Sequence, residues 1–144
     1  MADPAAPDGV TRRRAARERA LGLLYEAHTK REDVRELIAA LPLRPDRFAV
    51  ELCEGVADHE AELDATLREL STAWTPERMP VIDRIVLRLG AHELLHRPDI
   101  PTGVVLSEWV ELASEYSTAD SSRFVNGVLS RLARDGRPPS PDSE

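Results

Sequence analysis

The segment from residue 80 to residue 96 is apolar around most of its circumference, and this feature constrains the fold most. Drawn as a helix, it places apolar residues on two opposite faces, namely Val81, Ile82, Ile85, Val86, Leu87, Leu89, Ala91, Leu94 and Leu95. A helix without a broad polar face has to be covered on nearly all sides by other parts of the chain. We therefore expect this segment to lie at the centre of a helical bundle.

Helical periodicity extends through most of the remaining chain, and no stretch alternates apolar and polar residues for long enough to predict a strand. The pattern predicts six helices, over about residues 11–28, 31–40, 47–72, 80–96, 102–116 and 121–134. Asp46 is the expected N-cap of the third helix, and Gly136 suits the position just past the sixth. The prediction is an all-α protein of about six helices in two small bundles that share the fourth and fifth helices.

The two ends of the chain differ in composition from the part between them. Residues 1–10 and 136–144 are rich in proline and polar residues, and we predict that they are disordered tails flanking one helical domain over residues 11–135. The single cysteine, Cys53, excludes an intramolecular disulfide and a thiolate zinc cluster. No apolar run approaches the roughly 20 residues of a membrane span, and the first residues lack the pattern of a secretory signal. We expect a cytoplasmic protein without a membrane partner.

The sequence from His92 to His96 reads HELLH and fits the H-E-x-x-H pattern of zinc proteases. On a helix the two imidazoles lie one turn apart and could bind Zn²⁺ while Glu93 activates a water molecule. A protease would also need a third ligand, for which Glu111 and Glu115 are candidates, and a strand that aligns the peptide. Because the chain offers no strand, we interpret the two histidines as residues at the edge of the core. We predict no metal, no cofactor and no enzymatic activity.

The chain carries a net charge of −7, which argues against indiscriminate coating of nucleic acid. Residues 12–19 read RRRAARER and reverse this sign locally, with five arginines and one glutamate. We expect Arg12, Arg13 and Arg14 in the first turn of a helix, where the helix dipole is also positive. Such a conflict is typical of a site that binds an anion, and Arg17 extends it by one turn. Arginine pairs with phosphate and stacks on bases, so single-stranded RNA is the natural candidate ligand. On this pattern alone, a plain solvated surface helix is an equally good interpretation.

Four segments, in this order, resemble the NusB family of bacterial transcription antitermination factors. They are RRRAARERALGLLYE (12–26), VLRLGAHELL (86–95), IPTGVVLSEWVELASEYST (100–118) and FVNGVL (124–129). Together they cover nearly the whole region expected to fold. The resemblance implies two three-helix bundles. It assigns no metal to the Ala-x-Glu-Leu stretch that contains Glu93, so the H-E-x-x-H pattern is interpreted as a coincidence.

The resemblance also implies a function without catalysis. Members of this family bind boxA, a short single-stranded element of nascent ribosomal RNA, together with NusE, a protein of the small ribosomal subunit. The complex joins the elongating RNA polymerase with other Nus factors and helps it read through terminators. The resemblance places RNA contacts on Arg12, Arg13, Arg14 and Arg17.

Three further residues match positions that line the same RNA surface in the family, and each has a competing structural interpretation. Tyr25 either faces RNA or completes the core beside Leu23 and Leu24. Asp120 either faces RNA or caps the sixth helix. Phe124 either stacks on a base or continues the apolar stripe of that helix.

Two alternatives remain open. The chain could be a helical adaptor that binds proteins or itself without affinity for RNA, and its apolar helices permit a homodimer without requiring one. Asp83 and Glu93 would then belong to its contact surface, which is also where NusE is expected to dock. A related helical domain occurs fused to ribosomal RNA cytosine methyltransferases, but a second domain that binds S-adenosylmethionine is absent from these 144 residues.

Overall fold

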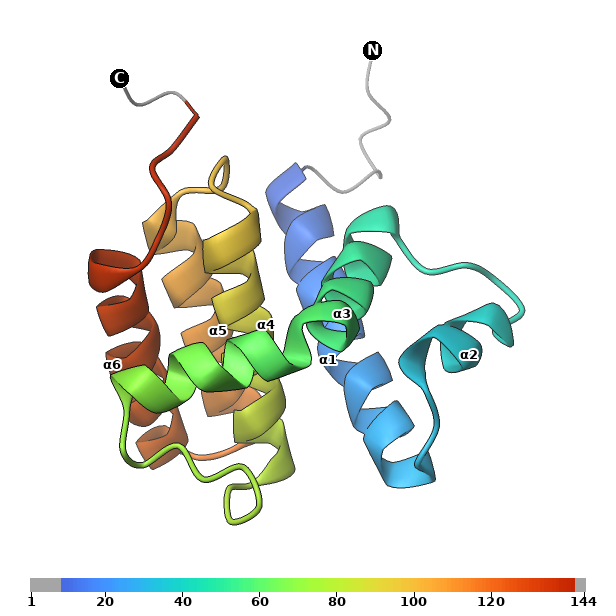
Figure 1. The fold of residues 1–144 in the computed structure, drawn as a ribbon. Coiled ribbons are helices and arrows are strands. Elements are labelled where there is room, and N and C mark those ends of the chain that lie inside the picture. Colours follow the sequence, from blue (N-terminus) through green and yellow to red (C-terminus); the bar gives the residue numbers. More distant parts are fainter. Residues whose placement is uncertain (1–8, 142–144) are drawn as a thin grey trace. The chain divides into compact units, whose positions relative to one another are not determined.

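The computed structural model describes residues 9–141, which form six α-helices and, within that range, no strand. The helices are α1 (Gly9–Lys30), α2 (Val34–Ala39), α3 (Arg47–Leu70), α4 (Val81–His96), α5 (Thr102–Tyr116) and α6 (Ala119–Asp135), as drawn in Figure 1. The prediction of an all-α protein with six helices is confirmed. In this part of the chain, no helix has the length and apolar character that crossing a membrane requires.

The helix boundaries follow local capping chemistry. Helix α2 begins at Val34, later than expected, because the Asp33 carboxylate accepts hydrogen bonds from the backbone N–H groups of Arg35 and Glu36, at 2.8 and 3.4 Å. Arg31 has a φ of 55°, a left-handed conformation that separates α2 from the preceding helix. The second helix is therefore shorter than expected, with 6 residues and less than two turns.

Helix α3 has the predicted cap and an unpredicted kink. The Asp46 carboxylate accepts a hydrogen bond from the backbone N–H of Phe48 at 2.8 Å, so its predicted capping role is confirmed. Twelve residues after α3 begins, His59 leaves helical geometry, with φ of −116° and ψ of 17°. The apolar stripe of α3 continues on both sides of this residue, and for that reason periodicity alone predicts one straight helix.

The chain divides into two compact units, residues 1–54 and residues 55–144. The first unit contains α1, α2 and the beginning of α3, and the second contains the rest of α3 together with α4, α5 and α6. The helix that both units share is α3, so the expectation that α4 and α5 form a shared spine is wrong. Helices α4, α5 and α6 pack against one another inside the second unit, where Figure 1 shows them side by side.

Helix α4 is buried over most of its surface, as its apolar circumference predicts. Its buried residues include Ile85, Val86, Leu87, Leu89, Gly90, Ala91 and Leu94. The Glu93 side chain lies in the same environment with 0% exposure, and its carboxylate accepts a hydrogen bond of 2.9 Å from the indole N–H of Trp109 on α5. A buried charged group needs such a partner, so this bond helps to fix how α5 packs on α4.

The chain after α6 is anchored at one residue. The Arg137 guanidinium donates hydrogen bonds to the carbonyl oxygens of Leu94 and Arg97, at 3.0 and 2.9 Å, and also to the Ile100 carbonyl and the Thr102 hydroxyl. A cation thereby satisfies carbonyl groups at the C-terminal end of α4. The disordered tail expected from residue 136 therefore contains a residue that is held in place. Residues 1–8 and 142–144, which belong to the predicted tails, lie outside the described residues.

Two glycines of the second unit have opposite surroundings. A Cβ atom built on Gly55 in α3 would lie 2.1 Å from Cε1 of the buried His92 ring. A Cβ atom on Gly127 in α6 would meet nothing within 4 Å. A glycine in mid-helix at position 127 suggests a close helix contact, but the structure shows open space there and a close approach at Gly55.

We expect Gly55→Ala to lower the free energy of unfolding by about 1–3 kcal/mol, because the His92 ring would have to move within a packed interior. Gly127→Ala should raise it by about 1 kcal/mol, because alanine restricts the unfolded chain and has open space in the helix. Urea denaturation followed by circular dichroism measures both effects. Stabilisation by Gly55→Ala would contradict the packing described around Gly55, and destabilisation by Gly127→Ala would contradict the open space at Gly127.

Candidate nucleic-acid interface

Three consecutive arginines, Arg12, Arg13 and Arg14, are exposed on α1. Because α1 begins at Gly9, only Arg12 lies in the first turn, and Arg13 and Arg14 belong to the second. The expectation that all three occupy the first turn is therefore corrected. The arginines remain near the positive end of the helix dipole, but its effect on them is weaker than expected.

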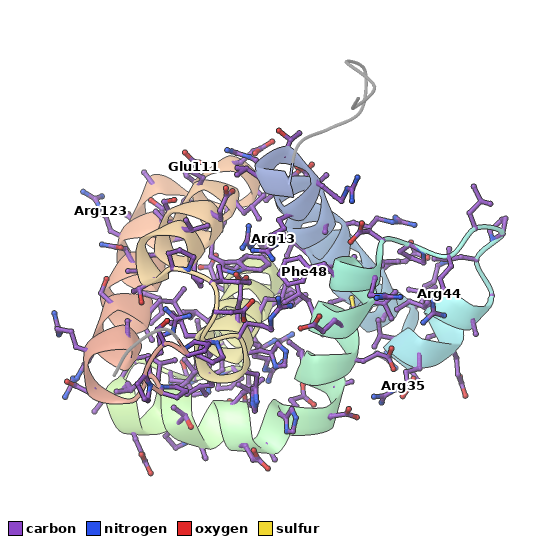
Figure 2. The ribbon with its side chains drawn as sticks, turned by 90° about the horizontal axis from the view of Figure 1, so that it is seen from above. Arg13, Arg35, Arg44, Phe48, Glu111 and Arg123 are labelled. Atoms are coloured by element: carbon purple, nitrogen blue, oxygen red, sulfur yellow. The ribbon has the colours of Figure 1, made fainter. Side chains whose placement is uncertain are left out.

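Phe48 lies in the first turn of α3, and its ring contacts two arginines of α1, namely Arg13 and Arg17. The guanidinium carbon of Arg13 is 5.7 Å from the ring centroid and that of Arg17 is 5.4 Å from it. Figure 2 shows Arg13 next to Phe48 in this arrangement. Residues 13 and 17 are one turn apart and share a face of α1, so one aromatic ring can contact both.

Arg17 is buried, although an RNA contact is expected to lie at the surface. Its exposure is 1%, whereas its neighbours in the row, Arg12 to Arg14, are exposed. The electron-rich face of the Phe48 ring is one of the contacts of this buried charge. The sequence pattern shows Arg17 as a continuation of the charged row, but it does not show which face of α1 is covered.

The charges of the two units differ. Residues 1–54 contain ten basic and ten acidic residues, whereas residues 55–144 contain nine basic and sixteen acidic residues. The net charge of −7 therefore belongs to the second unit. A polyanion is repelled much less by the first unit, which carries the arginine row.

Tyr25 lies on α1 in the same unit and is 42% exposed. Leu23, by contrast, has 0% exposure, so the alternative that Tyr25 completes the core is wrong. An exposed aromatic ring with a hydroxyl group can stack on a base and form a hydrogen bond at the same time.

Asp120 and Phe124 lie on α6 in the second unit. The helix begins at Ala119 and its cap is Thr118, whose hydroxyl accepts a hydrogen bond of 3.0 Å from the backbone N–H of Ser121. The capping role considered for Asp120 therefore belongs to Thr118. Asp120 lies in the first turn, exposed, and pairs with Arg123. Phe124 is half-buried, so part of its ring remains accessible while the rest joins the apolar face of α6.

Asp83 and Glu93, which we expected in an exposed protein-contact surface, are both buried, with exposures of 5% and 0%. The Asp83 carboxylate accepts a hydrogen bond of 2.7 Å from the Ser121 hydroxyl. The Glu93 carboxylate accepts its hydrogen bond from the Trp109 indole N–H. Both carboxylates connect helices inside the second unit. A side chain without accessible atoms makes no direct contact with a partner, so the expected exposure of these two residues is corrected.

The histidines of the HELLH segment form a stack with a third histidine that sequence reasoning did not connect to them. The ring centroids of His59 and His96 are 4.6 Å apart, and those of His92 and His96 are 4.8 Å apart. The rings are nearly parallel, with interplanar angles of 15° and 28°. Ring nitrogens bind a metal in the plane of the ring, and nearly parallel planes do not converge on one point.

A metal centre also lacks support from the other candidate ligands. Glu93 is bonded to Trp109, and Glu111 and Glu115 are exposed on α5. Among residues 9–141, no group of three or more histidine, cysteine, aspartate or glutamate side chains is arranged to hold a metal ion. The three histidines are better described as a packed aromatic cluster beside the kink of α3.

The environment of the stack lowers the pKa of His92 to about 4. Burial is the largest cause, followed by repulsion from His96, His59 and Arg97, while Asp58 acts in the opposite direction. Burial and the proximity of His59 also lower the pKa of His96. His59 and His96 therefore disfavour protonation of His92, and His59 disfavours protonation of His96.

We expect acid to destabilise the second unit through His92. Because its folded pKa lies below the unfolded value, the unfolded state binds more protons, and stability falls as the pH decreases from about 6.5 to about 4. The loss attributable to His92 should reach up to about 3 kcal/mol. Urea denaturation at several pH values should show a smaller loss for His92→Gln than for the unchanged protein. Equal losses over this range would contradict the assignment, because the carboxylates contribute equally to both proteins.

Known proteins resemble this chain along most of its length. A model of the NusB family matches residues 14–134. The transcription antitermination protein NusB of Acidothermus cellulolyticus is 46% identical over 124 residues, which cover 83% of this chain and 86% of that protein. The corresponding protein of Kineococcus radiotolerans is 43% identical over 125 residues, which cover 84% of this chain and 92% of that protein.

Solved structures show the same fold. The structure of NusB from T. maritima has a TM-score of 0.78 and 33% identity, and the match covers 88% of this chain and 93% of that one. A crystal structure of the antitermination factors NusB and NusE in complex with double-stranded RNA gives a TM-score of 0.71 and 25% identity, covering 85% of this chain and 96% of that one. The family match includes helices of both units, the arginine row from Arg14 onward, and the FVNGVL segment of α6. On this basis the chain belongs to the NusB family.

Proposed function

We propose that this protein is a transcription antitermination factor that binds boxA-type single-stranded RNA in nascent ribosomal RNA together with NusE. Relatives more than 40% identical carry the name of that function, and a related NusB was crystallised with NusE and RNA. The protein acts by binding, without catalysis, in the cytoplasm. The observation that carries the proposal is the exposed row of Arg12, Arg13 and Arg14 on α1.

The proposed RNA contacts combine charge with stacking. The three exposed arginines pair with phosphate groups, and their planar guanidinium groups also stack on bases. Tyr25 and the accessible part of Phe124 offer aromatic faces, and Asp120 offers a carboxylate that accepts hydrogen bonds from base amino groups. The RNA-bound protein then joins the elongating RNA polymerase with NusE and the other Nus factors and helps it read through terminators.

The test is fluorescence anisotropy of a labelled boxA-type RNA titrated with the protein, with and without NusE. A scrambled single strand tests sequence preference, and a duplex of the same sequence tests strandedness, because the related complex contains double-stranded RNA. We expect the boxA single strand to bind most tightly and NusE to strengthen binding. Equal affinity for the three RNAs would contradict recognition of single-stranded boxA.

Replacing Arg12, Arg13 and Arg14 together by glutamine should weaken binding by at least tenfold at moderate salt. Log affinity should fall with log salt at a slope about 2 units less steep than for the unchanged protein, from roughly 0.7 per phosphate contact. Arg68 and Arg134, which are exposed arginines of the second unit, provide a control. Their replacement by glutamine should change the affinity less than twofold.

Two results would redirect the proposal. An unchanged slope in the triple variant would mean that the RNA surface does not include the α1 row. Failure to bind any RNA, with a NusE complex still visible by size-exclusion chromatography, would support the alternative of a protein-binding adaptor.

A further inference from the structure

We propose that Phe48 is a positioning residue for RNA binding: its ring holds the Arg13 guanidinium at the surface in the orientation that meets a phosphate group. This inference rests on the proposed RNA-binding function and adds a residue to it. The sequence places Phe48 in the apolar stripe of α3, where a role limited to the core is expected.

The position of the ring is determined locally. The Asp46 carboxylate accepts a hydrogen bond from the backbone N–H of Phe48, which fixes the first turn of α3. The Phe48 side chain is only 9% exposed, so it has little freedom to move. A fixed ring is a suitable surface on which to order a long and otherwise mobile arginine side chain.

The two cations over this ring differ in exposure. Arg17 is buried with its guanidinium carbon 5.4 Å from the centroid, and Arg13 is exposed with its guanidinium carbon 5.7 Å from it. Because Arg13 is the exposed cation of the two, its guanidinium is the one that a phosphate group can reach from solvent. The fixed Phe48 ring restricts where this guanidinium lies before the phosphate arrives, and this lowers the ordering cost of binding.

The aromatic face matters separately from the volume of the side chain. Leucine would fill much of the same space, but it lacks the negative face that attracts a cation. Tyrosine keeps such a face on a ring of the same size. Replacing Phe48 by leucine should therefore weaken RNA binding by about threefold to tenfold, and replacement by tyrosine should keep it within about twofold of the unchanged protein.

Arg12 supplies a matched control for the contact. It is the neighbour of Arg13, is also exposed, and carries the same charge. Arg13 and Arg17 lie over the Phe48 ring, and within residues 9–141 the structure shows no such contact for Arg12. A positioning role predicts that Phe48 is coupled to Arg13 and is independent of Arg12.

The experiment is a pair of double-mutant cycles, measured as affinity for the boxA-type single strand at one salt concentration. One cycle combines Phe48→Leu with Arg13→Gln, and the other combines Phe48→Leu with Arg12→Gln. We expect the first double variant to bind about as weakly as Arg13→Gln alone. In the second cycle, we expect the loss of affinity in the double variant to equal the product of the two single losses. Urea denaturation of every variant separates loss of binding from loss of folding. If Phe48→Leu does not fold, Phe48→Met takes its place in both cycles.

The outcomes distinguish this inference from the function on which it rests. If the unchanged protein binds RNA and both cycles multiply, the positioning role is overturned and the proposed function stands. Equal coupling in both cycles would also overturn it, because Phe48 would then affect the whole helix. If the unchanged protein binds no RNA with or without NusE, the proposed function and this inference fail together.

Discussion

The burial of α4 is the constraint on which the second unit depends. A helix that is apolar around most of its circumference exposes too much apolar surface unless other helices cover it. Helices α5 and α6 provide this cover, and each packs against α4 and against the other. The buried Glu93 carboxylate needs the hydrogen bond that the Trp109 N–H donates. This requirement restricts how α5 can rotate on α4. Apolar burial supplies the driving force, and one polar bond selects a particular packing.

The first unit resolves a different conflict, which concerns charge. Consecutive cations near the start of a helix repel one another and oppose the helix dipole. The structure reduces both costs. Gly9 and Val10 extend α1 beyond the arginines, so these lie farther from the helix end. The electron-rich face of the Phe48 ring contacts Arg13 and Arg17. A row that looks unfavourable in the sequence is thereby compatible with a stable helix, while its exposed members keep their charge for a ligand.

Much of the fold was predictable because it depends on local patterns. The boundaries of α5 agree with the prediction at both ends, and the Asp46 cap lies where it was expected. Several misplaced features depend on partners distant in sequence. Asp83 bonds to Ser121, which is 38 positions away, and a charged residue with a distant buried partner looks like a surface residue in the sequence. The His59 kink was missed because an apolar stripe continues through it.

The candidate site was predictable to a similar extent. The arginine row stands out by composition, and its exposed members lie at the surface as expected. Which of its arginines is buried, and on what, depends on the contact between α1 and the first turn of α3, and no periodicity encodes that contact. The sequence shows that Arg17 is charged but not that it is buried, and it shows that Phe48 is apolar but not that its ring lies against two cations.

The distribution of charge explains how a protein with a net charge of −7 can bind RNA. Electrostatic attraction in physiological salt is screened over about 8 Å, so a polyanion responds to the charges of the surface that it approaches more than to the total. The excess of acidic residues lies entirely in residues 55–144, whereas acidic and basic residues are equal in number in residues 1–54. An RNA that contacts the α1 arginines therefore meets a local positive field, while the acidic second unit disfavours binding of RNA at arbitrary positions. The same net charge that excludes a general RNA-coating protein is consistent with one that binds RNA at a restricted surface.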